Sequence, residues 1–312
     1  MPTQVPIGIF NVAKTVVDKD EVKRWMEFIG AEFEIPDDGA VSNPALLIAL
    51  AGKRCYMSFD EKLNPNISRI RKDYAEYFDN ILKSGHGSVL EHSVFTFSIE
   101  NVSRVFTAEM NRHRAGWAIS EGSLRFIRFG ENIPYWMPTS IQGPDVLTGE
   151  TAAVDPCWAV VAMQYNGGDI EKIRFELNHW LKRTDAADHL DLRKQLTREV
   201  FKQAFASQEE YYKIMEVIWD MDESDHNFSY KKKVTSMMRR IIGLGVATGG
   251  VWSGNVRALR HVMTMRCSKV AEEEILHVFS RIAKRMQEQE PLLFGDFYQD
   301  DDGFWQPKYV KV

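Results

Sequence analysis

The sequence from Val89 to Phe129 reads VLEHSVFTFSIENVSRVFTAEMNRHRAGWAISEGSLRFIRF and predicts a strand, a helix, a basic loop and a second strand in succession. In its first part, VLEHSVFTFSIE, β-branched and aromatic residues partly alternate with polar ones, as in a half-buried strand. Asn101 or Ser103 can cap the short helix RVFTAEMNRHR that follows. After the basic loop, SLRFIRF is again strand-like. The stretch therefore indicates a compact unit of strands and helices.

Helices are expected on both sides of this stretch. PALLIALAGKRCY has the composition of a buried helix, and ISRIRKDYAEYFDNILKSGHG carries apolar residues three and four apart until Gly85 ends the helix. Residues 130–168 are rich in Gly, Pro, Thr and Asp and are expected to be a connector. Helical patterns then cover residues 170–183, His189 to about Asp220, a run from Tyr230, Val256 to Arg266, and Ala271 to Gln287.

Composition and charge limit the class of protein. The chain has 312 residues, of which 44% are apolar and 27% are charged, as in ordinary globular proteins. The formal net charge of −5 argues against a nucleic-acid partner, because coating a duplex needs a broad basic surface. The three cysteines are far apart and form no CxxC pair, so neither a disulfide framework nor a zinc site is expected.

The sequence has no features of export or membrane insertion. No stretch approaches the roughly 20 uninterrupted apolar residues of a membrane span. The N-terminal sequence MPTQVPIGIFNVAKTVVDKDEVKRW lacks the basic-then-apolar layout of a signal peptide. We therefore expect a cytoplasmic protein with no membrane partner and no metal centre.

The basic loop has two interpretations. Arg112, His113 and Arg114 end the predicted helix, where cations simply interact favourably with the helix dipole. The continuation favours a second interpretation, because polar residues at positions 121, 123 and 125 alternate with small or apolar ones. In an extended segment the side chains of Ser123 and Arg125 would then point the same way, and together they resemble a phosphate clamp.

A second basic segment, NVRALRHVMTMR, lies near the C-terminus. Asn255, Arg257, His261 and Arg266 cannot all share one face of a helix, so a surface helix remains an alternative to a binding element. His92 lies within an apolar, strand-like pattern, where a histidine is more often a satisfied core residue than a ligand-binding group. Spacing alone does not decide between these alternatives.

Taken together, these segments resemble the flavin-dependent thymidylate synthases. The hallmark of that family is Arg-His-Arg followed after about seven residues by Ser, and here eight residues separate Arg114 from Ser123. SEGSLRF is similar to the family's Asn-Glu-x-Ser-x-Arg-Tyr. Four further segments match in order: AGKRCYMSF, GHGSVLEHSVFTF, IPYWMP and NVRALRHVMTMRCS. The resemblance covers roughly residues 44–290.

The resemblance implies an α+β fold in which a central, mostly antiparallel sheet is flanked by long helices. It implies an N-terminal extension over residues 1–43 and a catalytic domain over residues 44–312, with a helical insertion around 147–220. It also implies a homotetramer whose active sites are shared between chains, so that site residues need not meet within one chain.

The reaction that the resemblance implies is the methylation of dUMP to dTMP at uracil C5. NADPH reduces FAD, methylenetetrahydrofolate donates the one-carbon unit, and the reduced flavin supplies a hydride. By resemblance, the residues that contact FAD are His92, Arg112, His113, Arg114, Glu121, Asn255, Arg257 and His261. The residues that bind the nucleotide are Glu109, Glu121, Ser123, Leu124 through its backbone, Arg125, Arg240 or its neighbour Arg239, and Arg266. Arg266, at the uracil ring, and Ser123 are the expected catalytic residues.

The sequence departs from the family pattern in several places. Ala108 and Glu109 stand where Arg-Gln is typical, the loop has one extra residue, and Trp117 replaces a small polar residue. A carboxylate at position 109 would repel a phosphate but could accept hydrogen bonds from sugar hydroxyls. We therefore also consider UMP or another pyrimidine nucleotide as substrate. A non-catalytic flavin- and nucleotide-binding protein is a further alternative, and an RNA-binding module is disfavoured by the net charge.

Overall fold

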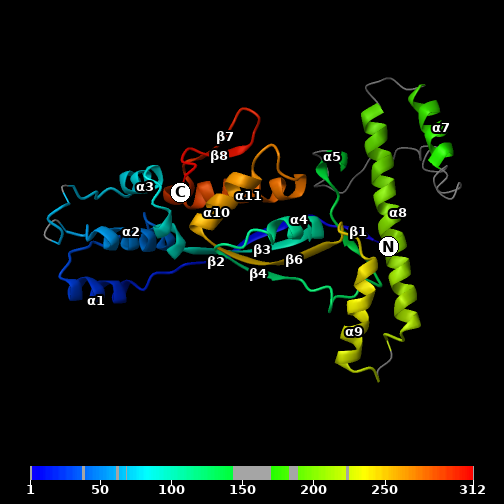
Figure 1. The fold of residues 1–312 in the computed structure, drawn as a ribbon, viewed down its shortest axis with the longest axis horizontal. Helices are drawn as coiled ribbons and strands as arrows, with labels where there is room; N and C mark the ends of the chain where they lie inside the picture. The colour runs from blue at the N-terminus through cyan, green and yellow to red at the C-terminus, as the bar shows by residue number, and fades with distance from the viewer. Residues whose placement is uncertain are drawn as a thin grey trace. The chain divides into compact units, whose positions relative to one another are not determined.

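A four-stranded sheet with the order β2-β3-β6-β4 organises the larger part of the computed structural model (Figure 1). Its strands are β2 (Gly8–Lys14), β3 (Val94–Ser103), β4 (Trp117–Glu121) and β6 (Ala247–Asn255). The pairs β2–β3 and β4–β6 are both antiparallel. Together with the helices around it, this sheet confirms the expected α+β fold.

The structure describes residues 2–36, 39–60, 63–67, 69–142, 170–182, 189–222 and 225–311. They divide into two compact units. The sheet unit comprises Gly8–Glu100, Phe106–Glu121 and Gly249–Val312, and the helical unit comprises Met1–Ile7, Asn101–Val105 and Gly122–Thr248. The start of the predicted insertion, residues 147–169, lies outside the described residues.

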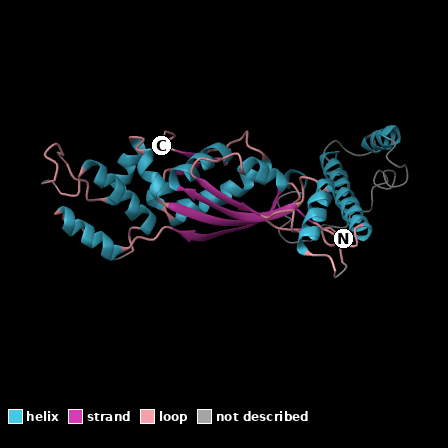
Figure 2. Ribbon diagram, turned by 60° about the horizontal axis from the view of Figure 1, so that its bottom comes forward, coloured by secondary structure: helices cyan, strands magenta, loops and turns pink. Residues whose placement is uncertain are grey.

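Aromatic side chains cover one face of the sheet in the sheet unit. Along β3, the side chains of Phe95, Phe97 and Ile99 are buried on alternate positions. The ring of Phe106 lies edge-on to Trp252 at 5.9 Å and stacks on Phe279 at 6.5 Å. The helices that carry or flank these contacts, which Figure 2 shows beside the strands, are α4 (Arg104–Met110), α10 (Val256–Arg266), α11 (Glu273–Gln289) and α12 (Pro291–Phe294).

The N-terminal part of the sheet unit is helical. It contains α1 (Lys19–Ile29), α2 (Asn43–Tyr56), α3 (Tyr74–Lys83) and the 3-10 helix η1 (Gly87–His92). Val22, Met26, Leu46, Leu50 and Phe59 form one buried cluster that joins α1 to α2. The boundary expected near residue 43 stays a prediction, although β2 precedes it and forms a strand of the main sheet.

The predicted helix of residues 67–83 begins later than its apolar pattern indicates. Asp73 caps α3 by accepting a hydrogen bond from the backbone N–H of Glu76 at 2.7 Å. Gly85 has a φ of 67°, a left-handed conformation that glycine adopts without strain, and it turns the chain after α3 as expected.

The helical unit is built around its own core. Its elements are β1 (Thr3–Gln4), β5 (Pro134–Tyr135), α5 (Thr139–Gln142), α7 (Ile170–Leu181), α8 (His189–Ile218), α9 (Phe228–Met238) and the 3-10 helix η2 (Arg239–Ile241). The long helix α8 confirms the run predicted from His189. Tyr135 stacks on Phe205 at 4.5 Å, and Tyr212 is fully buried.

Two predicted strands are shifted along the sequence. After the basic loop the strand is β4, over Trp117–Glu121, rather than SLRFIRF. The carbonyl of Ser123 accepts hydrogen bonds from the N–H groups of Phe126 at 3.0 Å and Ile127 at 3.3 Å, so this segment turns instead of pairing. His92 ends η1 and is exposed, and β3 begins only at Val94.

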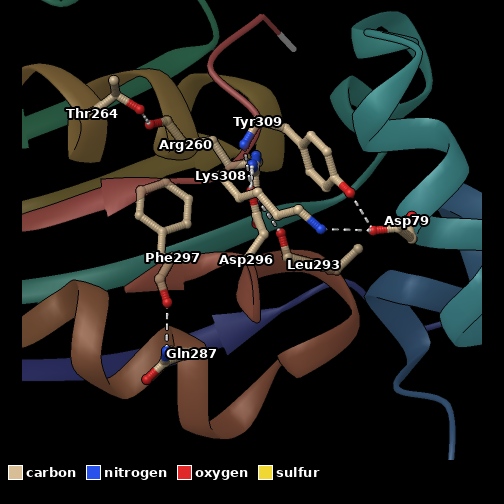
Figure 3. A network of polar contacts seen from close by, with 9 residues as sticks. All are labelled: Asp79, Arg260, Thr264, Gln287, Leu293, Asp296, Phe297, Lys308 and Tyr309. Atoms are coloured by element: carbon tan, nitrogen blue, oxygen red, sulfur yellow. Dashed lines mark hydrogen bonds and ion pairs between the residues drawn. The ribbon is translucent and has the colours of Figure 1, made fainter. Parts of the chain in front are cut away.

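A buried ion pair fixes the C-terminal end of the sheet unit (Figure 3). Arg260 of α10 donates two hydrogen bonds to the carboxylate of Asp296, at 2.6 and 2.8 Å, and a third to the carbonyl of Leu293 at 2.6 Å. Both side chains are almost fully buried. Asp296 precedes β7 (Phe297–Gln299), which pairs with β8 (Trp305–Pro307). The pair therefore fastens α10 to the C-terminal segment.

In the described part of the chain, no helix is long and apolar enough to cross a membrane.

We predict that Asp296→Ala lowers the free energy of unfolding by roughly 3–5 kcal/mol, because it leaves the buried guanidinium of Arg260 without its counter-charge. Chemical denaturation of the two proteins measures the difference. Asp302→Ala is the matched control, since its carboxylate is 69% exposed and lies 3.8 Å from Lys269. The control should change stability by less than about 0.5 kcal/mol. Equal effects of the two substitutions would contradict the role assigned to the pair.

Candidate functional site

The basic loop is anchored to the N-terminus of α10 in the sheet unit. Gly116 has a φ of 76°, and its carbonyl accepts a hydrogen bond from the N–H of Asn255 at 3.0 Å. A Cβ at this glycine would lie 2.7 Å from Cβ of Ala258, so no larger residue fits without a shift. The side chain of Asn255 caps α10 by accepting from the N–H of Ala258 at 2.8 Å. Asn255, predicted to contact FAD, therefore has a structural role at this junction.

Arg266, at the last turn of α10, is held by two groups that belong to the motif region. Its Nε donates to Nε2 of His113 at 2.8 Å. Its Nη1 lies 2.8 Å from Oε2 of Glu109, and the Arg266 side chain is only 18% exposed. The structure thus brings together the expected ring-binding arginine, the central histidine of the motif and the carboxylate that distinguishes this chain. The guanidinium keeps further donors for a ligand.

His113 is a neutral acceptor in this arrangement. Burial lowers its pKa from the ordinary value of 6.5, and the nearby cation of Arg266 and the ring of His261 lower the pKa further, while Glu109 opposes the shift. The rings of His113 and His261 lie 6.3 Å apart, edge to face. Because Arg266 donates to Nε2, the ring proton of His113 resides on Nδ1.

The other two basic residues of the motif, Arg112 and Arg114, are exposed to solvent. Arg112 is 75% exposed, with its Nη1 3.6 Å from Oε1 of Glu109, and Arg114 is exposed as well. A surface pair of this kind contributes little to stability. Both guanidinium groups are therefore accessible to an anionic ligand or to another chain.

Glu121 ends β4 and is tied to the loop. Its carboxylate accepts a hydrogen bond from the side-chain amide of Asn111 at 2.8 Å, and the same amide accepts from the indole of Trp252 at 3.3 Å. Glu121 is therefore held between the loop and β6.

The remaining predicted nucleotide-binding residues belong to the helical unit. Ser123 Oγ accepts a hydrogen bond from the N–H of Arg125 at 3.4 Å, and the Arg125 side chain is exposed. The side chain of Leu124 is buried in the core of that unit, which fixes the backbone of the turn. Arg240 is exposed and donates to the carbonyl of Ser236 at 2.8 Å, whereas Arg239 is half-buried.

A cavity of about 610 Å³ lies in the sheet unit, next to the N-terminus of α10. Arg257 lines it, and the Arg257 guanidinium lies 2.7 Å from the carboxylate of Glu91. The cationic or imidazole side chains that line the cavity are Lys53, Arg69, Arg71, His86 and Arg257. No carboxylate is among its described lining residues. The cavity therefore has the charge to bind an anion.

The histidine among the described residues that line this cavity is His86, and the FAD contact of His92 stays a prediction. His86 follows the left-handed Gly85 and stacks on Tyr56 with ring centroids 5.8 Å apart, and both rings line the cavity. His92 is exposed and does not line the cavity. The sequence signal for His86 is its place between two glycines in GHG, because such a pair of glycines indicates a turn after the preceding helix.

Comparison with known proteins identifies relatives over most of the chain. Residues 40–292 match the family model described as thymidylate synthase complementing protein. The chain is 27% identical over 270 residues to the flavin-dependent thymidylate synthase of Corynebacterium aurimucosum, covering 86% of this chain and 85% of that protein. It is 28% identical over 262 residues to the probable flavin-dependent thymidylate synthase of Mycobacterium phage D29, covering 84% and 87%.

The fold is also similar to a crystal structure of a UMP/dUMP methylase from Streptomyces cacaoi bound with 5-Br dUMP. The TM-score is 0.54 at 15% identity, and the alignment covers 95% of this chain and 96% of that one. At this identity the likeness concerns the fold alone.

We predict that Arg266→Met raises the pKa of His113, because it removes both the neighbouring positive charge and the hydrogen bond that occupies Nε2. An NMR titration of the imidazole measures the shift, with the exposed Lys269→Met as control. In the unchanged protein, the pKa of His113 is lower in the folded state than in the unfolded state. As the pH falls, the unfolded state therefore binds a proton at this histidine before the folded state does. The free energy of unfolding should therefore decrease as the pH falls below about 6.5. An unchanged His113 pKa in Arg266→Met would contradict the electrostatic coupling.

Proposed function

Because the chain belongs to the family of flavin-dependent thymidylate synthases, we propose that it transfers a one-carbon unit reductively to uracil C5 of dUMP and releases dTMP. The observation that carries this proposal is the position of Arg266, which His113 and Glu109 hold at 2.8 Å each. Two fixed contacts pre-orient the guanidinium, so little rearrangement is needed when a substrate binds.

The role proposed for Arg266 is to bind the uracil ring. Its unused N–H groups form a planar fork that can donate to a carbonyl oxygen of the uracil ring. As the ring is attacked, negative charge develops on these atoms, and a fixed cation stabilises the transition state more than the ground state. His113 and Glu109 act through Arg266 and are positioning residues in this account.

The nucleotide phosphate is proposed to bind to Ser123, the backbone N–H of Leu124, Arg125 and Arg240. The turn at Ser123 carries a half-buried hydroxyl, the backbone amide of Leu124 and the exposed guanidinium of Arg125, which are donors suited to phosphate oxygens. The exposed Arg112, Arg114 and Arg240 are available to a neighbouring subunit, and we propose a homotetramer in which chains share these sites.

The proposed cofactor is FAD, and the residues of the cavity fit it. Arg257 and His86 lie in a cavity with basic groups and no described carboxylate, which suits a diphosphate, and the ring of Tyr56 offers a planar surface for stacking. We propose that Arg112, His113 and Arg114 approach the cofactor from an adjacent chain. When bound, the flavin supplies the redox chemistry that amino-acid side chains lack. NADPH as reductant, methylenetetrahydrofolate as carbon donor and a cytoplasmic location complete the proposal.

Glu109 favours a second candidate substrate, UMP. Its carboxylate is 28% exposed and adjoins the arginine that is proposed to hold the base. A carboxylate accepts hydrogen bonds and can therefore bind the additional ribose hydroxyl of a ribonucleotide. The fold neighbour from Streptomyces cacaoi is described as a UMP/dUMP methylase, which makes the comparison of the two substrates worth testing.

The test of the proposed reaction is the mass of the nucleotide product. The purified full chain is incubated with FAD, NADPH, methylenetetrahydrofolate and either dUMP, UMP or dCMP. We expect a one-methyl gain on dUMP, and a roughly 10²–10³-fold loss of kcat/KM in Arg266→Met because the stabilising cation is removed. Lys269→Met serves as the exposed-cation control. NADPH oxidation without any methylated nucleotide would instead support a binding-only flavoprotein.

The second candidate predicts an effect of Glu109→Gln on substrate choice. If the carboxylate binds the ribose 2′-hydroxyl, this variant should lower the ratio of kcat/KM for UMP to that for dUMP by about 10-fold, the value of one charge-assisted hydrogen bond. A loss of the same size for both substrates would indicate that Glu109 serves only to orient Arg266. Competition assays with both nucleotides in one mixture measure the ratio directly.

A further inference from the structure

Lys53 is a buried lysine between two cavities of the sheet unit. It lies near the end of α2 and is only 7% exposed. It lines the cavity of about 610 Å³ described above, and it also lines a second cavity of about 630 Å³. Neither the sequence pattern nor the proposed reaction gives this residue a role.

The ammonium group of Lys53 has weak partners. Its Nζ donates a hydrogen bond to the carbonyl of Arg71 at 3.3 Å, and it lies 5.1 Å from the ring centroid of Tyr77 and 5.9 Å from that of Phe33. Among the residues that the structure describes, no carboxylate forms an ion pair with it. Burial accordingly lowers the pKa of the Lys53 side chain.

The arginines of the same cavity differ from Lys53 in this respect. Arg69 and Arg71 lie 2.7 and 3.3 Å from the carboxylate of Glu76, and Arg257 lies 2.7 Å from Glu91. Lysine is rarely buried without a counter-charge, because transfer of the ammonium group out of water is costly. A purely structural role at this position could be filled by an apolar side chain of similar length.

The two cavities differ in the charge that surrounds Lys53. Glu32 and Glu34 line the second cavity together with Lys72, so a phosphate there would meet repulsion. The first cavity has only basic and neutral groups among its described lining residues. An anion is therefore favoured on the first side of Lys53.

We propose that Lys53 binds a phosphate group of the dinucleotide cofactor in the first cavity. This inference rests on the proposed function, in which that cofactor is FAD. The ligand supplies the counter-charge that the protein lacks, and the compact ammonium group, on the part of α2 that lines the cavity, can donate to a diphosphate oxygen. The cost of burying the lysine is thus offset on binding.

The test compares Lys53→Met, Lys53→Arg and Lys72→Met in the full chain. Titration calorimetry measures the binding of FAD, ADP and adenosine, and thermal unfolding is measured without ligand. Lys53→Met should weaken FAD and ADP about 10- to 100-fold, as expected for a lost charge-assisted hydrogen bond. It should leave adenosine unaffected and should not lower the unfolding temperature. Lys53→Arg should retain FAD binding within a few-fold, and Lys72→Met, which changes only the second cavity, should match the unchanged chain.

The opposite results separate the inference from the proposed function. Unchanged FAD and ADP affinity in Lys53→Met overturns the inference, and so does an equal loss for adenosine or a lower unfolding temperature, since these indicate a structural lysine. A chain that binds ADP through Lys53 but not FAD would keep the anion-binding role and overturn the proposed cofactor. A chain that binds neither FAD nor ADP overturns both.

Discussion

The contact between Gly116 and the first turn of α10 is the constraint on which the candidate site depends. The backbone hydrogen bond between Gly116 and Asn255 fixes the position of the basic loop against this helix. It can form because Gly116 adopts a left-handed conformation next to the cap residue Asn255. His113 is thereby brought within hydrogen-bond distance of Arg266 at the far end of α10. The basic loop is thus positioned by a neutral, local packing contact rather than by its charges.

Carboxylates on the same unit orient several of the cations that face a potential ligand. Glu109 holds Arg266, Glu91 holds Arg257 and Glu76 holds Arg69. Such partly exposed pairs add little to stability, but they restrict the rotamers of long side chains before a ligand arrives. This arrangement explains how a chain with a formal net charge of −5 presents locally basic surfaces. The carboxylate partners therefore help to fix the orientation of these arginine side chains.

The sequence predicted the elements that depend on local pattern and missed those that depend on tertiary contacts. The helices α2, α8 and α10 follow from apolar periodicity, and the structure confirms them together with the α+β class that the resemblance implies. SLRFIRF has strand composition, yet the hydrogen bonds of Ser123 make it a turn, and the pairing with β6 goes to Trp117–Glu121 instead. His86 lines the cavity and His92 does not, because which histidine faces it depends on how α2, α3 and η1 pack. The spacing of apolar residues in the sequence predicts single helices and strands, but it does not show how these helices pack against one another.

The length of α10 has a consequence for how this chain can change over time. Arg257 and Arg266 stand nine positions apart on one uninterrupted helix, which corresponds to roughly 13 Å along its axis. The helix therefore fixes the distance between the cavity, which Arg257 lines, and the group of Arg266, His113 and Glu109 at its other end. Side chains along it can be exchanged without altering that spacing, whereas a single inserted or deleted residue would turn one end by about 100° relative to the other. Divergence in this segment is therefore open to substitution at its exposed positions and closed to changes in length.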